Sequence, residues 1–158
     1  MPERKPKTAK FLLLVTLCSR IHERPKTPQE QEIRTVLIVD DDPSVLRSLE
    51  RLVRAGGFEV RAFESPKALL SSEIPQTRTC MIIDVNLPEM SGVELCDVLA
   101  ATGHALPAIF ITGLSDDPKT NRLLRRARAI AILHKPFAAA LLFDALSLAF
   151  LGSQAKQN

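Results

Sequence analysis

The chain changes its pattern of apolar and polar residues at residue 33. From there on, short apolar runs alternate with segments in which apolar residues recur every three or four positions. A short unbroken apolar run is typical of a strand covered on both faces, and the second pattern is typical of an amphipathic helix. The pattern predicts strands at 35–39, 58–63, 80–83, 108–111 and 129–133. It predicts helices at 43–55, 66–71, 92–101, 118–127 and 137–150.

The ends of the predicted helices carry local signals. Asp42-Pro43 has the residue types of an N-cap and a first helical position, and Gly56-Gly57 suits the end of the same helix. Ser91 and Glu94 have the spacing of a capping box. Strands that alternate with helices in this way form a parallel sheet with helices on both faces. The sequence therefore predicts an α/β domain built on a five-stranded parallel sheet.

Residues 1–32 differ from the rest of the chain. They are rich in Pro, Lys, Glu and Gln, apart from one apolar run, Phe11–Cys18. A basic start before an apolar run is typical of a secretory signal, but this run is short and no small-x-small cleavage site follows it. It is also too short to span a bilayer. We expect a flexible N-terminal extension or a start assigned too early, with membrane-surface contact as an alternative. The predicted domain then covers 33–152, and 153–158 form a tail.

The charge and the cysteines narrow the class of protein. Seven of the 21 Lys and Arg and four of the 18 Asp and Glu lie in residues 1–32, which leaves 14 of each in residues 33–158. The net charge of +3 therefore gives no reason to expect nucleic-acid binding by the domain. Cys18, Cys80 and Cys96 show no paired spacing and suit free thiols in a reducing compartment, so we expect a cytoplasmic protein with no membrane span.

Polar side chains follow the strands of the predicted sheet. In an open parallel sheet, functional groups collect beyond the carboxyl ends of the strands. The residues of this kind after four of the predicted strands are Asp40, Asp41, Asp42, Asp84, Asn86, Thr112 and Lys135. All of them are expected at one end of the sheet, contributed by separate strands.

The chemistry of that set is specific. Carboxylates brought close together repel each other, so one of them is protonated or a cation lies among them. An all-oxygen site of carboxylates, a backbone carbonyl and water is the kind that Mg²⁺ prefers. A carboxylate beside such a metal can attack a phosphorus atom, while a Thr hydroxyl and a Lys ammonium hold the other phosphoryl oxygens. The set therefore points to an acyl-phosphate site.

Four segments resemble the receiver domain of bacterial two-component response regulators: VLIVDDDPSVLRSL, MIIDVNLPEMSG, AIFITG and HKPF. They come in the order of the family's first strand, phosphoacceptor strand, fourth strand and Lys-Pro step. The segments VDDDPSV and IFITG are similar to those of receiver domains of the nitrogen-fixation regulator type. The resemblance covers about residues 33 to 150. It implies a doubly wound, flavodoxin-like sheet in the order 2-1-3-4-5.

The resemblance also implies roles for individual residues. Asp84 would be the phosphoacceptor, and Asp40 and Asp41 the acidic pair that holds Mg²⁺, with Asp41 favoured as the direct ligand. Asn86 lies two residues past the acceptor, where the family supplies a backbone carbonyl to the metal. Thr112 would be the hydroxyl that turns toward the phosphoryl group.

Lys135 would be the ammonium that pairs with the phosphoryl group, and its peptide bond to Pro136 would be cis. Three features depart from the family. Ile132 stands where the family usually has a Phe or Tyr that moves with the threonine. The segment RRARAI replaces the usual small-residue turn before the fifth strand. Leu114 lies two residues past Thr112, at a position that in the family often affects water access to the phosphoryl group. These departures leave the phosphorylation site intact and bear on how its state is transmitted.

We therefore expect a single-domain response regulator that accepts a phosphoryl group from a sensor histidine kinase or phosphotransfer protein. It would act through an unknown downstream protein, as a monomer or a phosphorylation-dependent dimer, and would not be a conventional enzyme. A receiver-like module that works without phosphorylation is the alternative. An aspartyl-phosphate phosphatase is a weaker one, because Asn86 lies where that class needs a second acid. The arginines Arg122, Arg125, Arg126 and Arg128 form either a solvated face or a docking surface.

Overall fold

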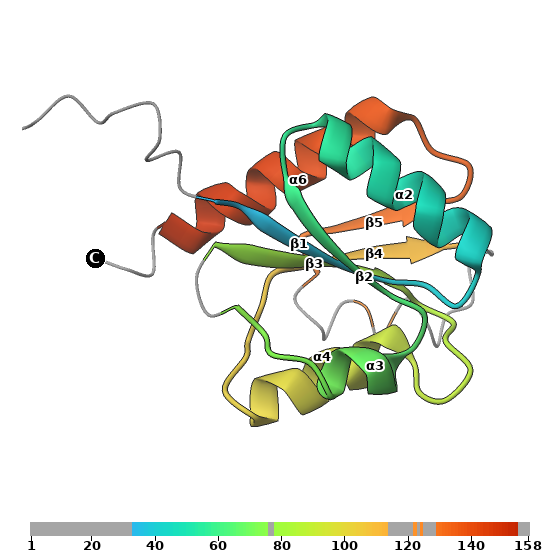
Figure 1. The fold of residues 1–158 in the computed structure, drawn as a ribbon, viewed down its shortest axis with the longest axis vertical. Helices are drawn as coiled ribbons and strands as arrows, with labels where there is room; N and C mark the ends of the chain where they lie inside the picture. The colour runs from blue at the N-terminus through green and yellow to red at the C-terminus, as the bar shows by residue number, and fades with distance from the viewer. Residues whose placement is uncertain (1–32, 76–77, 114–121, 123, 125–128, 155–158) are drawn as a thin grey trace, which may run out of the picture. The chain divides into compact units, whose positions relative to one another are not determined.

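The fold centres on a five-stranded parallel sheet in the order β2-β1-β3-β4-β5 (Figure 1). The computed structural model describes residues 33–75, 78–113, 122, 124 and 129–154. The strands are β1 (Thr35–Val39), β2 (Glu59–Phe63), β3 (Thr79–Asp84), β4 (Ala108–Thr112) and β5 (Ala131–His134). This confirms the predicted doubly wound α/β class, the strand order and the parallel pairing.

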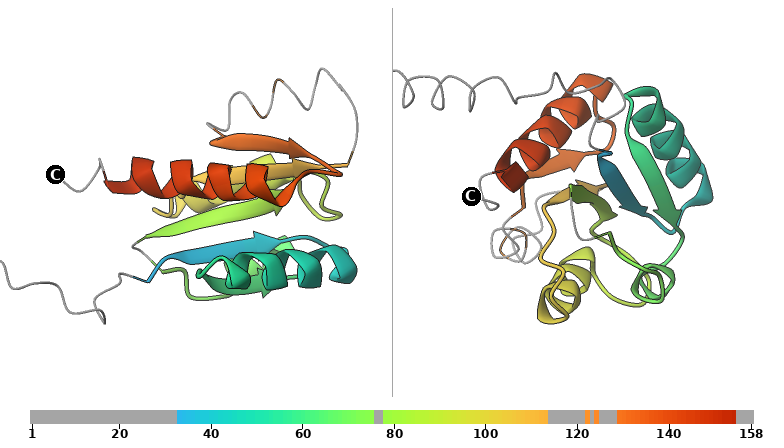
Figure 2. Two further views of the ribbon diagram at one scale, coloured as in Figure 1. Left: turned by 90° about the horizontal axis from the view of Figure 1, so that it is seen from above. Right: turned by 60° about the vertical axis from the view of Figure 1, so that its left-hand side comes forward.

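In the described part of the chain, four helices cover the two faces of the sheet (Figures 1 and 2). They are α2 (Pro43–Ala55), α3 (Pro66–Leu70), α4 (Gly92–Ala101) and α6 (Ala139–Gln154). Helices α2 and α6 lie on one face, and α3 and α4 lie on the other. The predicted helix at 118–127 falls almost entirely outside the described residues. No helix in the described ranges has the length and apolar character that crossing a membrane requires.

Alternation along the strands produces two cores. In β1, Val36 and Ile38 face the α2 and α6 side, whereas Leu37 and Val39 face the α3 and α4 side. All four are fully buried, as strands covered on both faces require. The edge strand β2 is less buried, which agrees with the alternating pattern of its sequence. The apolar runs therefore fix which strands are central.

Two elements differ from the prediction by more than one residue at a boundary. Strand β5 begins at Ala131 and not at 129, and α6 spans Ala139–Gln154 and not 137–150. The predicted start of α6 was wrong at Phe137, because this residue is partly buried against the core although it precedes the helix. An apolar residue that packs from a loop cannot be told from the first turn of a helix by periodicity alone.

Helix α4 begins with the capping box expected from its sequence. Ser91 Oγ accepts a hydrogen bond from the Glu94 amide at 3.2 Å, and the Glu94 carboxylate accepts one from the Ser91 amide at 2.8 Å. Both satisfy amides that the helix cannot pair internally. Asp42 caps α2 in the same way, by accepting from the amides of Ser44 and Val45.

Ser91→Ala is expected to lower the free energy of unfolding by about 1 kcal/mol, because the Glu94 amide loses its capping partner. Chemical denaturation followed by circular dichroism measures this loss. The control is Ser48→Ala, since that hydroxyl bonds within α2 to the Ser44 carbonyl and caps no helix end. A loss no greater than that of the control would contradict the capping role.

Cys80 and Cys96 are free thiols in apolar surroundings, as predicted. Burial raises the pKa of each to about 12, and the charge of Asp97 adds to the shift at Cys96. We expect iodoacetamide to alkylate both residues far more slowly in the folded chain than in denaturant at neutral pH, since the thiolate is the reactive form. Peptide mapping by mass spectrometry measures the two rates. Equal rates in the two states would contradict the burial.

An aromatic pair lies at the end of the sheet where β1 and β2 begin. Phe58, just before β2, stacks on Phe150 of α6 with ring centroids 5.5 Å apart. The Arg34 guanidinium lies 4.7 Å from the Phe58 centroid and 5.8 Å from that of Phe150. Such cation–π contacts stabilise exposed sites modestly. This end of the domain therefore ties α6 to the start of β1 and β2.

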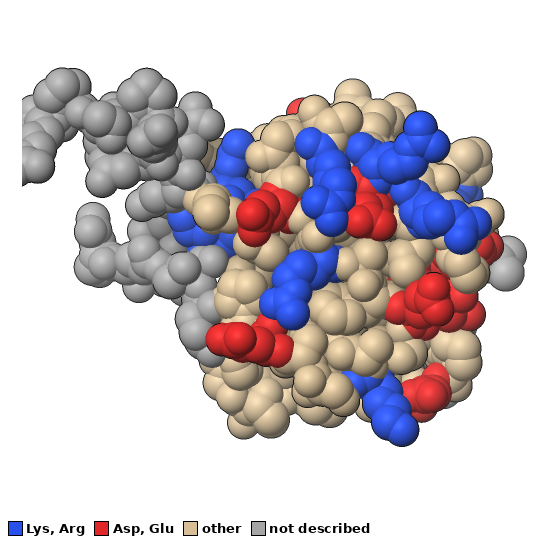
Figure 3. Space-filling view, viewed as in Figure 1, with Lys and Arg blue, Asp and Glu red and all other residues tan. Residues whose placement is uncertain are grey.

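Charged side chains are spread unevenly over the surface (Figure 3). Arg47, Arg51 and Arg54 are exposed at helical spacing on α2, and Arg54 pairs with Glu50 at 2.9 Å. The balanced charge of residues 33–158 therefore conceals a basic face on one helix.

Candidate phosphoacceptor site

The predicted site residues come from four neighbouring strands. Asp40 directly follows β1, Asp84 ends β3, Thr112 ends β4 and Lys135 directly follows β5. The parallel register places these strand ends at the same edge of the sheet, with Thr112 paired to His134 and Asp84 to Ile111. The sheet topology therefore collects residues that lie far apart in the sequence.

Lys135 joins two of the carboxylates. Its Nζ donates to Asp84 Oδ2 at 2.8 Å and to Asp40 Oδ2 at 3.0 Å. The exposed fractions of the three side chains are 26% for Lys135, 12% for Asp84 and 2% for Asp40. Burial alone would lower the pKa of Lys135, but hydrogen bonds to the two carboxylates and their charges raise it overall. The ammonium is therefore held in its charged form between the two acids.

Asp40 is the buried member of the cluster. Its Oδ1 accepts a hydrogen bond from the Asp42 amide at 2.9 Å, while Oδ2 accepts from Lys135. Burial raises the pKa of Asp40, and the hydrogen bonds from Asp42 and Lys135 offset part of that rise. Both oxygens of this carboxylate therefore have a protein donor, and its orientation is fixed.

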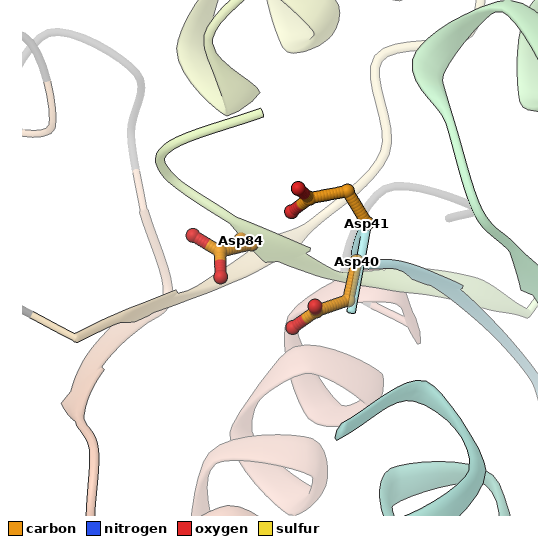
Figure 4. Close-up of side chains that lie close together, drawn as sticks. All are labelled: Asp40, Asp41 and Asp84. Atoms are coloured by element: carbon orange, nitrogen blue, oxygen red, sulfur yellow. The ribbon is translucent and has the colours of Figure 1, made fainter. Parts of the chain in front are cut away.

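Three carboxylates converge at this edge (Figure 4). One oxygen from each of Asp40, Asp41 and Asp84 lies within 4.8 Å of the other two. Asp41 is exposed, so its oxygens can bind a metal that also keeps water ligands, as Mg²⁺ does. The donor set, all oxygen and negatively charged, fits a hard divalent cation. The predicted metal ligands Asp40, Asp41 and Asp84 are thus brought together.

Asn86 lies in the loop after β3. Its side chain is exposed, and its amide donates to Asp84 Oδ1 at 2.9 Å. This bond orients the Asp84 carboxylate from the side opposite to the contact between Lys135 and Oδ2. The loop therefore holds the acid in place, and the role of the Asn86 carbonyl as a metal ligand stays a prediction.

Thr112 and Lys135 are linked through the backbone. The Lys135 amide donates to the Thr112 carbonyl at 2.8 Å, and Thr112 is 2% exposed. The Lys135-Pro136 peptide bond is cis, as the sequence resemblance implied. The role of the Thr112 hydroxyl toward a phosphoryl group stays a prediction.

The departures from the family pattern are partly visible. Ile132 is partly buried against the core cluster on the α3 and α4 side of the sheet. Leu114 and residues 125–128 fall outside the described residues, and Arg122 is exposed. Sequence reasoning singled out Ser91 and Glu94 at the start of α4 but missed Gly92, which packs against the backbone of Asp84. A glycine at the first position of a helix, directly after its cap, was the available signal.

A parallel sheet in this order, with three acids, a lysine and a threonine at its carboxyl edge, is the arrangement of a response regulator receiver domain. The sequence matches the response regulator receiver domain family over residues 36–147, and the chain belongs to that family.

Relatives of this chain include several bacterial regulators. Nodulation protein W of Bradyrhizobium diazoefficiens is 41% identical over 70% of this chain and 48% of its own length. Response regulator protein TmoT of Ectopseudomonas mendocina is 40% identical over 78% of this chain and 56% of its own length. The transcriptional regulatory protein FixJ of Rhizobium meliloti is 33% identical over 73% of this chain and 56% of its own length. The chain thus spans about half the length of these relatives.

Solved structures agree with the sequence relatives. The response regulator StyR superposes with a TM-score of 0.72 at 37% identity, over 79% of this chain and 63% of that one. The structure named FixJ-N superposes with a TM-score of 0.70 at 31% identity, over 77% of this chain and 96% of that one. The predicted similarity to the nitrogen-fixation regulator type is thereby confirmed.

Proposed function

We propose that Asp84 accepts a phosphoryl group from a sensor histidine kinase or phosphotransfer protein, in a reaction that requires Mg²⁺. The observation that carries this proposal is the contact of Lys135 with both Asp84 and Asp40, beside a third carboxylate. A purely structural ion pair needs neither the third acid nor an exposed side for an incoming group. Family membership adds independent support.

The proposed reaction uses few groups. An oxygen of the Asp84 carboxylate forms a bond to phosphorus, the bond from phosphorus to the donor breaks, and its electron pair leaves with the donor. Mg²⁺ held by Asp40, Asp41, Asp84 and the Asn86 carbonyl would offset the negative charge of the phosphoryl oxygens. Lys135 supplies a fixed positive charge to one of those oxygens, and Thr112 supplies a hydroxyl to another.

Phosphorylation would change the contacts of Lys135. In the structure its ammonium is shared by two carboxylates. A phosphorylated Asp84 offers more negative charge and more acceptor oxygens than a carboxylate does, so it would draw the ammonium away from Asp40. Because the Lys135 amide is bonded to Thr112, such a change would be felt at the ends of both β4 and β5.

We propose that the output runs through protein contacts, in the cytoplasm, and that the chain is not a conventional enzyme. Helix α6 supports a contact surface, since Leu141, Leu148 and Leu151 are 53%, 57% and 64% exposed. Such a concentration of exposed leucines on one helix is typical of interaction surfaces. The chain spans about half the length of its relatives, so action as a single domain, without direct nucleic-acid binding, stays a prediction.

Phosphorylation with a small-molecule donor tests the proposed function. The full chain is incubated with acetyl phosphate and either Mg²⁺ or excess EDTA, and intact-mass spectrometry measures phosphoryl incorporation. We expect one phosphoryl group per chain with Mg²⁺ and almost none with EDTA, mapped to Asp84 after chemical trapping. No incorporation with Mg²⁺, together with equal partner binding by the wild type and Asp84→Asn in a pull-down, would favour the phosphorylation-independent module.

A further inference from the structure

Helix α4 begins against the backbone of the phosphoacceptor. A Cβ atom added at Gly92 would lie 2.5 Å from the Asp84 carbonyl oxygen and 2.7 Å from Ile83 Cγ2. Real Cβ atoms do not approach other heavy atoms so closely, so one of the two elements would have to move. Glycine is required here by close approach, and not by a left-handed backbone conformation.

The contact closes a loop that carries part of the site. The Gly92 amide donates to the Val85 carbonyl at 3.1 Å, so the two ends of the loop from Val85 to Ser91 meet. Asn86 lies in this loop, and its amide donates to Asp84 Oδ1. The closing contact, the orienting bond and the proposed metal ligand are therefore parts of one short loop.

This contact differs from those of the other glycines in the described part of the chain. A Cβ at Gly56 would meet the ring of Phe143, which is a side chain and can move. At Gly57, Gly103, Gly113 and Gly152 nothing lies within 4 Å. Gly92 is thus the one whose replacement would press on a backbone atom, and that atom belongs to Asp84.

We propose that Gly92 is a positioning residue for phosphoryl transfer: by letting the first turn of α4 rest on the Asp84 carbonyl, it sets the loop that orients the Asp84 carboxylate and presents Asn86 to the metal. A side chain at this position would push the end of β3 and the loop apart. The Asp84 carboxylate would then lose the geometry in which Asn86 and Lys135 hold it. This inference rests on the proposed function.

Replacement by alanine separates positioning from folding. Gly92→Ala favours the helix itself, because alanine has a higher helix propensity than glycine. Gly152→Ala is the matched control, since Gly152 is also helical and has open space around it. Ser91→Ala is the second comparison, because it weakens the start of α4 without adding an atom near Asp84.

The experiment measures the rate of phosphorylation by acetyl phosphate as a function of Mg²⁺ concentration, with circular dichroism as the measure of folding. For Gly92→Ala we expect a folded chain, a Mg²⁺ concentration for half-maximal rate raised about tenfold or more, and a lower maximal rate. For Gly152→Ala and Ser91→Ala we expect both parameters within about twofold of the wild type. Tenfold corresponds to about 1.4 kcal/mol of site distortion.

Each outcome is decisive. Wild-type kinetics in Gly92→Ala, or equal losses in Gly92→Ala and Ser91→Ala, would overturn the proposal. A Gly92→Ala chain that does not fold would assign Gly92 to the packing of the core and would overturn it as well. Absence of phosphorylation in the wild type would instead refute the proposed function.

Discussion

Lys135→Ala is expected to lower the free energy of unfolding by about 3 kcal/mol at neutral pH. The substitution removes the ammonium that contacts Asp84 and Asp40 and leaves the buried Asp40 carboxylate without that donor. Urea denaturation followed by circular dichroism measures the loss, and the method suits a chain that has no Trp or Tyr. The control is Lys67→Ala on α3, where an exposed lysine is replaced and a change within about 0.5 kcal/mol is expected.

The loss should depend on pH. Burial raises the pKa of Asp40, so the folded chain binds this proton more tightly than the unfolded chain does. The charged carboxylate therefore costs stability above the folded pKa, and the cost disappears as the pH falls toward 3.8, the ordinary pKa of an aspartate. A neutral Asp40 needs no ammonium, so the deficit of Lys135→Ala shrinks under mildly acidic conditions. Equal stability of variant and wild type at neutral pH would contradict the proposed role of Lys135 as a counter-charge.

Asp84→Asn is expected to abolish phosphoryl incorporation while leaving the fold intact. The amide oxygen of asparagine can still accept from the Asn86 amide, but the amide cannot form the acyl phosphate. The stability should change little or increase, because one of three neighbouring negative charges is removed.

Intact-mass spectrometry after incubation with acetyl phosphate and Mg²⁺ measures the effect of Asp84→Asn. Asp97→Asn is the matched control, because Asp97 is an exposed acid on α4. That control should be phosphorylated like the wild type. Full incorporation in Asp84→Asn would show that another residue is the phosphoacceptor.

The central strands were predictable because a strand covered on both faces must be continuously apolar. The first strand was predicted at its observed bounds, and the third was predicted one residue short at each end, at Thr79 and at Asp84. The position of the candidate site residues at one edge was predictable as well, since parallel topology brings the ends of β1, β3, β4 and β5 together there. The start of β5 was wrong, because Ala129 and Ile130 pack against the core although they precede the strand, and the start of α6 was wrong, because Phe137 packs into the core from a loop.

The geometry inside the site was beyond the reach of sequence patterns. No periodicity shows that both oxygens of Asp40 are taken by donors, one local and one from a residue 95 positions away. The contact between Gly92 and Asp84 likewise depends on how closely α4 approaches β3, which is a tertiary distance. Local signals name the residues, whereas packing decides their contacts.

The aromatic pair of Phe58 and Phe150, covered by Arg34, has a consequence for how the domain opens. It joins the start of β2 to the end of α6 at one edge, whereas β5 lies at the opposite edge, and Leu133 is the one residue of that strand that is buried. We therefore expect local opening to reach β5 more readily than the edge that the aromatic pair holds. Lys135 follows β5 and contacts Asp84. Local opening of β5 would therefore expose a phosphorylated Asp84 to water, while the edge with the aromatic pair stays folded. The lifetime of the phosphorylated form would then depend on the rate at which β5 opens locally, and not on the rate of global unfolding.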